Sequence, residues 1–334
     1  IARRQRQMCI RDSYVDCFTT VSEITNNECR ELLDKPADVV LMNGFEDDFV
    51  PKGATFTGKR KRARSTMLRV ANCLLGEDLG DDTLIIGTSG RYEFKNKGID
   101  VFLESLNRLN RDKDLKKKVL AFVNVPSWVG DPREDLQKRL KSKDKFTEPL
   151  QCPFITHWLH NMTHDQVLDM LKYLGMGNRP EDKVKVIFVP CYQDGHDGIL
   201  NKHYYDLILG EDLSVYPSYY EPWGYTPLES VAFRVPTITT DLAGFGLWVN
   251  SLKNQHGIND GVEVLHRSDY NYSEVADGIK DTVALFSTKT EAEIKEIRKR
   301  AGQVAEQALW KHFIQYYYEA YDIALRNAMK RQLK

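Results

Sequence analysis

The chain has 334 residues, a size at which one hydrophobic core usually gives way to about two domains. Its 47 lysine and arginine residues nearly balance its 48 aspartate and glutamate residues, so the net charge is -1 at pH 7. This balance argues against a general nucleic-acid or membrane-surface binder, which would carry a clear basic excess. No apolar run approaches the ~20 residues that span a bilayer, and no signal peptide is recognised.

The cysteines are scattered and form no Cys-x-x-Cys pair. In a chain of this size they predict reduced thiols of a cytoplasmic protein, and they indicate neither a disulfide framework nor a zinc site. The six are Cys9, Cys17, Cys29, Cys73, Cys152 and Cys191.

The first part of the chain predicts three features in order. Residues 1–13 open without a methionine and are basic and rich in glutamine, so we expect a non-native or disordered tail, with a solvated native tail as the alternative. Residues 14–80 contain a β-branched run, a helix that stops at Pro36, and a second buried strand at 37–44. The basic run at 58–64 predicts a solvated helix face, with an anion site as the alternative.

Residues 81–272 alternate regularly between strands and helices. The strands are continuous apolar runs, so both faces of their sheet should be covered. Strands that alternate with helices predict parallel βαβ units in a doubly wound, Rossmann-like α/β domain, and residues 273–334 should add carboxy-terminal helices. The expected strands are 82–90, 117–126, 184–190, 213–218, 235–240 and 261–268, and helices are expected at 99–109, 204–211 and 227–234.

The junction after the strand at 213–218 is the most informative segment. Thr226 suits a helix N-cap, Pro227 suits the first helical position, and Glu229 stands where a capping box wants an acid. A helix that begins in this way offers free backbone N–H groups to a diphosphate. Glu221 precedes Glu229 by eight residues, so both acids can face one pocket. The alternative is that Glu229 only caps the helix and Glu221 is an ordinary loop acid.

The residues of this junction also carry a family resemblance. The segment PSYYEPWGYTPLES at 217–230, followed by VPTITTDLAGFG at 235–246, resembles the signature of fungal and animal glycogen synthases. It includes the Glu-x7-Glu pair of retaining GT-B glycosyltransferases, which have two Rossmann-like domains. The resemblance continues in GRYEFKNKGIDVFLESLNRLN at 90–110 and in NRPEDKVKVIFVP at 178–190, and it covers residue 14 to the end.

The resemblance implies roles for individual side chains. Glu221 would hold hydroxyls of the transferred glucose, and Glu229 would hold the ribose of the nucleotide. Arg91 and Lys97 match the pair that grips the diphosphate, and Tyr204 matches the ring that stacks on uracil. Without the resemblance, the two cations would be read as solvated surface residues and the tyrosine as a core residue.

The loop before the helix completes the expected site. Backbone N–H groups of Gly224, Tyr225 and Thr226 would complete the phosphate site, and Trp223 of the same aromatic segment is assigned to substrate binding. The resemblance implies no cofactor and no metal. The one Asp-x-Asp motif, at 112–114, lies in a lysine-rich run and should face solvent.

Three histidines stand at the spacings of three and four residues that helical metal sites use. No clear carboxylate or cysteine partner is set beside them in the sequence, so we favour surface or structural histidines over a metal site. They are His157, His160 and His164.

The resemblance implies transfer of glucose from UDP-glucose to the non-reducing end of an α-1,4-glucan with retention of configuration. The first of the two GT-B domains should be largely missing, so we expect the chain to be inactive alone. The open alternatives are an ADP-glucose-dependent synthase and a non-catalytic module that binds nucleotide or glycogen. A homo-oligomer is compatible with the sequence, whereas nucleic-acid and membrane partners are not expected.

The resemblance also bears on regulation. In the fungal and animal family, activation by glucose 6-phosphate depends on an arginine-rich helix near the carboxyl end. Here Arg298, Lys299 and Arg300 remain, but three acids precede or adjoin them at helical spacing. We therefore expect weak activation. The acids are Glu291, Glu293 and Glu296.

Overall fold

The computed structural model describes residues 15–253 and 255–332, and its centre is a six-stranded parallel sheet. The order of the strands is β10-β9-β8-β3-β4-β7, and every neighbouring pair is parallel. The fold is therefore the doubly wound, Rossmann-like α/β class that the sequence predicts. The strands are β3 (Leu84–Ser89), β4 (Val119–Asn124), β7 (Val184–Val189), β8 (Leu213–Val215), β9 (Thr237–Thr240) and β10 (Val262–Leu265).

Each long strand is buried on both faces because alternate apolar side chains enter two different cores. In β3, Leu84 and Ile86 join the core beneath α4 (Ile99–Asn110) and α10 (Tyr272–Ser287). Ile85 points to the other face, where it packs with α3 (Gly53–Leu75). This two-sided burial explains why the strands read as uninterrupted apolar runs.

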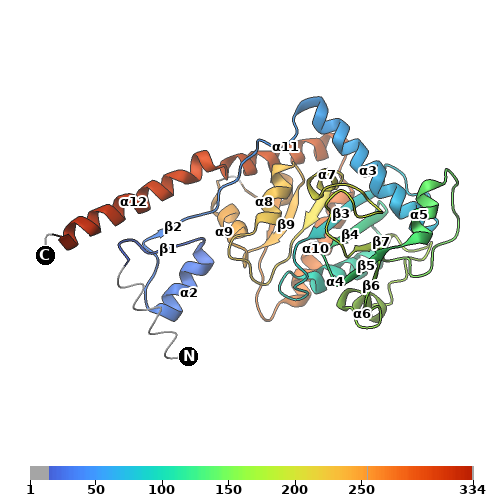
Figure 1. The fold of residues 1–334 in the computed structure, drawn as a ribbon, viewed down its shortest axis with the longest axis horizontal. Coiled ribbons are helices and arrows are strands. Elements are labelled where there is room, and N and C mark those ends of the chain that lie inside the picture. Colours follow the sequence, from blue (N-terminus) through green and yellow to red (C-terminus); the bar gives the residue numbers. More distant parts are fainter. Residues whose placement is uncertain (1–14, 254, 333–334) are drawn as a thin grey trace.

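The remaining helices cover the sheet and its edges (Figure 1). Helix α8 packs against α11, and α3 packs against both α5 and α7. These helices are α5 (Glu134–Lys141), α6 (Gln166–Tyr173), α7 (Tyr204–Ile208), α8 (Tyr225–Ala232), α9 (Gly244–Ser251) and α11 (Glu291–Gln307), with a 3₁₀ turn at Ile258–Asp260.

A small unit lies apart from the main sheet and is reached by the last helix. It contains β1 (Thr19–Thr20) and β2 (Val39–Val40), which pair in parallel, and α2 (Glu23–Leu33). Helix α12 (Trp310–Gln332) extends away from the main sheet to this unit, as Figure 1 shows. There, Asn327 Nδ2 donates a hydrogen bond to the carbonyl of Asp16 at 2.8 Å. Two further short strands, β5 (Val129–Pro132) and β6 (His157–Leu159), form an antiparallel pair.

The basic run at 58–64 differs from its prediction as a solvated face. It lies within α3, and two of its arginines turn inward to the carboxylate of Asp212. Arg60 binds one oxygen at 2.5 Å and Arg64 binds the other at 2.6 Å. The sequence could not reveal this pairing because the partner lies about 150 residues further along the chain.

The tail predicted at residues 1–13 lies outside the described residues. Helix α3, which precedes the expected domain start at residue 81, packs its apolar side chains into the sheet's core. Helix α10 does the same after the expected domain end at 272. No helix of the described chain is long and apolar enough to cross a membrane.

Candidate functional site

A cavity of about 340 Å³ opens where the strands end. Its walls come from the segments that follow β3, β4 and β7 and from the first turns of α7 and α8. Carboxyl ends of parallel strands meet at one edge of a sheet, which is where ligands of doubly wound folds bind. The lining residues include Arg91, Asn124, Cys191, Gln193, Tyr204 and Thr226.

Three of the predicted site residues therefore share one cavity. Tyr204 begins α7, and its hydroxyl lies 3.0 Å from Oγ of Ser89 at the end of β3. Burial raises the pKa of the Tyr204 phenol well above its ordinary value, so the ring is a neutral wall. Arg91 follows β3 with its side chain 77% exposed and pairs with Glu93 at 3.0 Å. An exposed surface ion pair is weak, so the guanidinium can turn to an anion in the cavity.

Helix α8 begins earlier than the sequence predicts. Its N-cap is Gly224 and its first residue is Tyr225, so Thr226 is not the cap and Pro227 is the third helical residue. Gly224 has φ +108, which a glycine adopts without strain. Glu229 consequently lies beyond the position of a capping-box acid.

The amino end of α8 has unused hydrogen-bond donors. Within the described chain, no hydrogen bond is donated by the backbone N–H groups of Gly224, Tyr225 and Thr226. Free N–H groups at a helix start, with the positive end of the helix dipole, form a general anion site. The predicted phosphate-binding backbone is therefore available, although the helix boundary was wrong by two residues.

Lys97 and Glu221 meet in an ion pair. Their side chains are only 14% and 20% exposed, and the lysine ammonium binds Oε2 of the glutamate. The backbone N–H of Glu221 donates a hydrogen bond to the carbonyl of Leu242, and its carbonyl accepts one from Gly244, the first residue of α9. Gly98 follows Lys97 with φ +68, and a Cβ there would lie 2.0 Å from the carbonyl oxygen of Pro217. The backbone contacts of Glu221 hold one partner of the ion pair, and the close approach of Gly98 to Pro217 holds the segment that carries the other partner, Lys97.

Glu229 is held by a residue that the sequence analysis did not select. The hydroxyl of Tyr205 donates a hydrogen bond to Oε1 of Glu229 at 2.8 Å. Burial raises the pKa of Glu229, and the Tyr205 hydrogen bond opposes that rise. Glu229 lies one turn after Thr226 on α8, so the two share a face of the helix.

The Trp223 side chain lies elsewhere than at the cavity. It is 3% exposed and packs against Phe245, Trp248 and Phe313 in the core beneath the loop. Its indole Nε1 is buried without a hydrogen-bond partner in the described chain. The structure therefore gives this tryptophan a packing role under α8, in contrast to the substrate contact expected from the sequence.

A second polar feature of the cavity was also missed. Gln193 Nε2 donates a hydrogen bond to Oδ1 of Asn124 at 2.8 Å, and both residues line the cavity. Asn124 ends β4 and Gln193 follows β7, so both lie at the sheet edge where ligands of doubly wound folds bind. Neither belongs to a motif by which the sequence predicts the site.

The three histidines at helical spacing do not lie on one helix. His157 begins strand β6, whereas His160 and His164 are exposed in the segment after it. The helical spacing therefore has no structural meaning here. The ring of His160 instead lies 5.0 Å from that of Trp128 on the surface.

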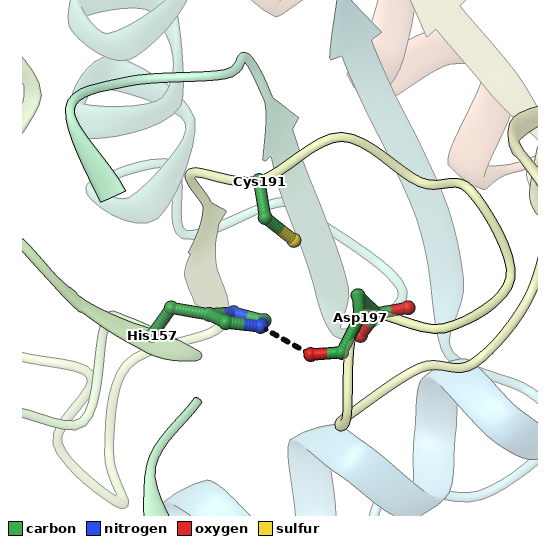
Figure 2. A group of neighbouring side chains, drawn as sticks. All are labelled: His157, Cys191 and Asp197. Atoms are coloured by element: carbon green, nitrogen blue, oxygen red, sulfur yellow. Dashed lines mark hydrogen bonds between the residues drawn. The ribbon is translucent and has the colours of Figure 1, made fainter. Parts of the chain in front are cut away.

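Figure 2 shows that His157 meets Cys191 and Asp197, a set of residue types that can bind metal. Nε2 of His157 donates a hydrogen bond to the backbone carbonyl of Asp197 at 2.7 Å, and Nδ1 lies 2.9 Å from the Thr156 hydroxyl. The Asp197 carboxylate accepts hydrogen bonds from the backbone of residues 199–201. Burial raises the pKa of the Cys191 thiol to about 12. Both ring nitrogens of His157 and the carboxylate of Asp197 are thus engaged in hydrogen bonds that hold this loop.

Comparisons with known proteins identify the family of the chain. The chain matches the family described as "Glycogen synthase" over residues 5–131 and 135–334. It is 28% identical to a glycogen [starch] synthase of Neurospora crassa, covering 94% of this chain and 52% of the relative. It is 29% identical to glycogen [starch] synthase isoform 2 of Saccharomyces cerevisiae, over 96% of this chain and 54% of the relative. It is 26% identical to the liver glycogen [starch] synthase of Mus musculus, over 96% of this chain and 53% of the relative. The chain spans about half the length of these relatives.

Solved structures support the fold. The catalytic domain of starch synthase IV from Arabidopsis thaliana, bound to ADP and acarbose, matches with a TM-score of 0.56 at 12% identity, over 92% of this chain and 55% of that chain. A sucrose-phosphate synthase from Thermosynechococcus elongatus matches with a TM-score of 0.53 at 16% identity, over 100% of this chain and 62% of that chain. The parallel sheet has the arrangement of GT-B glycosyltransferases, and the chain belongs to the glycogen synthase family.

Proposed function

We propose that this chain is the nucleotide-sugar-binding half of a retaining glucosyltransferase that transfers glucose from UDP-glucose to the non-reducing end of an α-1,4-glucan. The observation that carries the proposal is the convergence of the cavity with the free amino end of α8. Arg91, Tyr204 and Thr226 line that cavity, and the residues that match the glycogen synthase family include all three.

In this proposal the diphosphate lies at the start of α8. Cleavage of the glucose–phosphate bond leaves charge on the departing diphosphate. Preorganised N–H groups, Arg91 and Lys97 would stabilise that charge as it develops. The ammonium of Lys97 binds Glu221 in the structure, so bound UDP-glucose would have to separate this ion pair. The lysine would then turn to the diphosphate and the glutamate to the glucose hydroxyls. The Tyr204 ring would stack on the base.

We further propose that turnover needs a second, amino-terminal domain. Strands β1 and β2 have two residues each, and a two-stranded sheet is rarely stable by itself. Helix α12 beside them exposes apolar side chains that a domain could cover: Tyr318 is 59% exposed, Leu325 59% and Met329 62%. The relatives, about twice as long, have sequence to provide such a domain.

Calorimetry with UDP tests the proposal. UDP should bind the chain weakly, and Arg91→Ala should weaken binding roughly ten- to a hundredfold, because it removes a charge-assisted contact. Arg111, the exposed residue that caps the carboxyl end of α4, is a matched control. Its replacement by alanine should leave the affinity for UDP unchanged. A folded chain that gives no UDP heat would contradict the proposal. Tighter binding of ADP than of UDP would favour an ADP-glucose-dependent synthase.

A further inference from the structure

Glu229 offers only one of its carboxylate oxygens to a ligand. Oε1 accepts the hydrogen bond of Tyr205 at 2.8 Å, whereas no residue in the described ranges donates to Oε2. The glutamate is half-buried on α8, one turn beyond a residue that lines the cavity. A carboxylate accepts hydrogen bonds and donates none, so the free oxygen suits hydroxyl donors of a ligand.

Tyr205 is itself held firmly. Its ring stacks on Phe233 with the centroids 5.3 Å apart and the planes 4° apart. The ring centroid of Phe49 lies 5.0 Å from that of Tyr205, and the centroid of Tyr204 lies 5.3 Å from it. A ring enclosed by three aromatic neighbours keeps its hydroxyl in one place. The hydroxyl can therefore fix the orientation of the carboxylate that it binds.

We propose that Tyr205 is a positioning residue of the donor site, which holds Oε1 of Glu229 so that Oε2 faces the ribose hydroxyls of the nucleoside diphosphate. This inference rests on the proposed function, because it takes Glu229 as the ribose-binding acid. It adds a residue outside the Glu-x7-Glu segment, supplied by α7, to a carboxylate that makes no ion pair within the described residues.

The contact also favours the ionised form of the carboxylate. Burial raises the pKa of Glu229, and the Tyr205 hydrogen bond lowers it. Two other phenols interact electrostatically with this carboxylate, those of Tyr204 and Tyr225. Burial raises the pKa of both, so neither carries charge near neutral pH. Tyr205 is the one described residue whose side chain donates a hydrogen bond to Glu229.

Tyr205→Phe tests the inference because it removes the hydroxyl and keeps the stacked ring. The ligands are UDP and 2′,3′-dideoxy-UDP, measured by calorimetry on the 334-residue chain. We expect UDP to bind about three- to tenfold more weakly, as for the loss of one oriented hydrogen bond, and dideoxy-UDP to bind as it does to the unaltered chain. The loss should thus depend on the ribose hydroxyls.

Tyr219→Phe is the matched control, since Tyr219 also donates its hydroxyl to a carboxylate, that of Asp269, at an exposed place. It should change neither affinity. An equal loss for both ligands would show that Tyr205 is merely structural, and no loss for UDP would also overturn the inference. If Arg91→Ala still weakens UDP binding in that case, the proposed function stands and only the role of Tyr205 falls. If the unaltered chain fails to bind UDP, both fall.

Discussion

Replacement of Asp212 by asparagine should strongly destabilise the sheet that carries the site. Asp212 is a buried anion among three arginines. Its carboxylate binds Arg60 at 2.5 Å and Arg64 at 2.6 Å, and it accepts a hydrogen bond from the backbone of Ile85 at 2.9 Å. Arg298 of α11 is also buried beside this group, with only a backbone carbonyl as its hydrogen-bond acceptor in the described chain.

The magnitude follows from this arrangement. Removal of one partner from a buried ion pair costs about 3–5 kcal/mol, because the other charge is left uncompensated. The side chains of Arg60 and Arg64 are 20% and 13% exposed, so water reaches them in part. We therefore expect Asp212→Asn to lower the free energy of unfolding by about 3 kcal/mol, the lower end of that range.

Urea unfolding followed by tryptophan fluorescence measures this change. The control is Asp206→Asn, which breaks the more exposed pair with Lys59 at 2.8 Å and should cost at most about 1 kcal/mol. The arginines hold the pKa of Asp212 below its ordinary value despite burial. The stability that Asp212 contributes is therefore fully present above the pKa that this residue has in the unfolded chain. It is lost as the pH falls through the lower pKa that Asp212 has in the folded protein. A loss no larger than that of Asp206→Asn, or an unchanged acid limb, would refute the reasoning.

Three further predictions concern activity. In an enzyme completed by an amino-terminal domain, Glu221→Gln should greatly reduce glucose transfer and nearly preserve UDP binding; equal loss of both would assign Glu221 to the nucleotide. The isolated chain should transfer negligible glucose to glycogen, because orientation of two reactants supplies about 7–11 kcal/mol, and robust incorporation would contradict the two-domain proposal. Millimolar glucose 6-phosphate should barely raise full-length activity, since Glu296 pairs with Lys299 and Arg300; a several-fold rise abolished by Arg298→Ala with Arg300→Ala would oppose this.

The strands of the main sheet could be predicted because each is a long apolar run. β3, β4 and β7 lie within the expected ranges. The β-branched run before the first helix and the expected strand at 37–44 each contribute only two strand residues, because apolar composition alone does not supply the neighbouring strands that extend a ladder.

The site was only partly visible in the sequence. The family resemblance selected Glu221 and Lys97, which the structure brings into contact. The start of α8 was misplaced because the sequence offered Thr226 as a cap, whereas Gly224 takes that position with a positive φ. Tyr205 could not be identified, since its contact with a carboxylate 24 residues away depends on how α7 packs beside α8.

A crystal structure of the chain with UDP tests the central claim most directly. We predict the diphosphate at the amino end of α8, within hydrogen-bond distance of the backbone N–H groups of residues 224–226 and of Arg91. The uracil should lie against the ring of Tyr204, and Lys97 should have turned from Glu221 to the phosphates. UDP bound away from the cavity between β3 and α8, or a diphosphate without contact to the start of α8, would contradict the account.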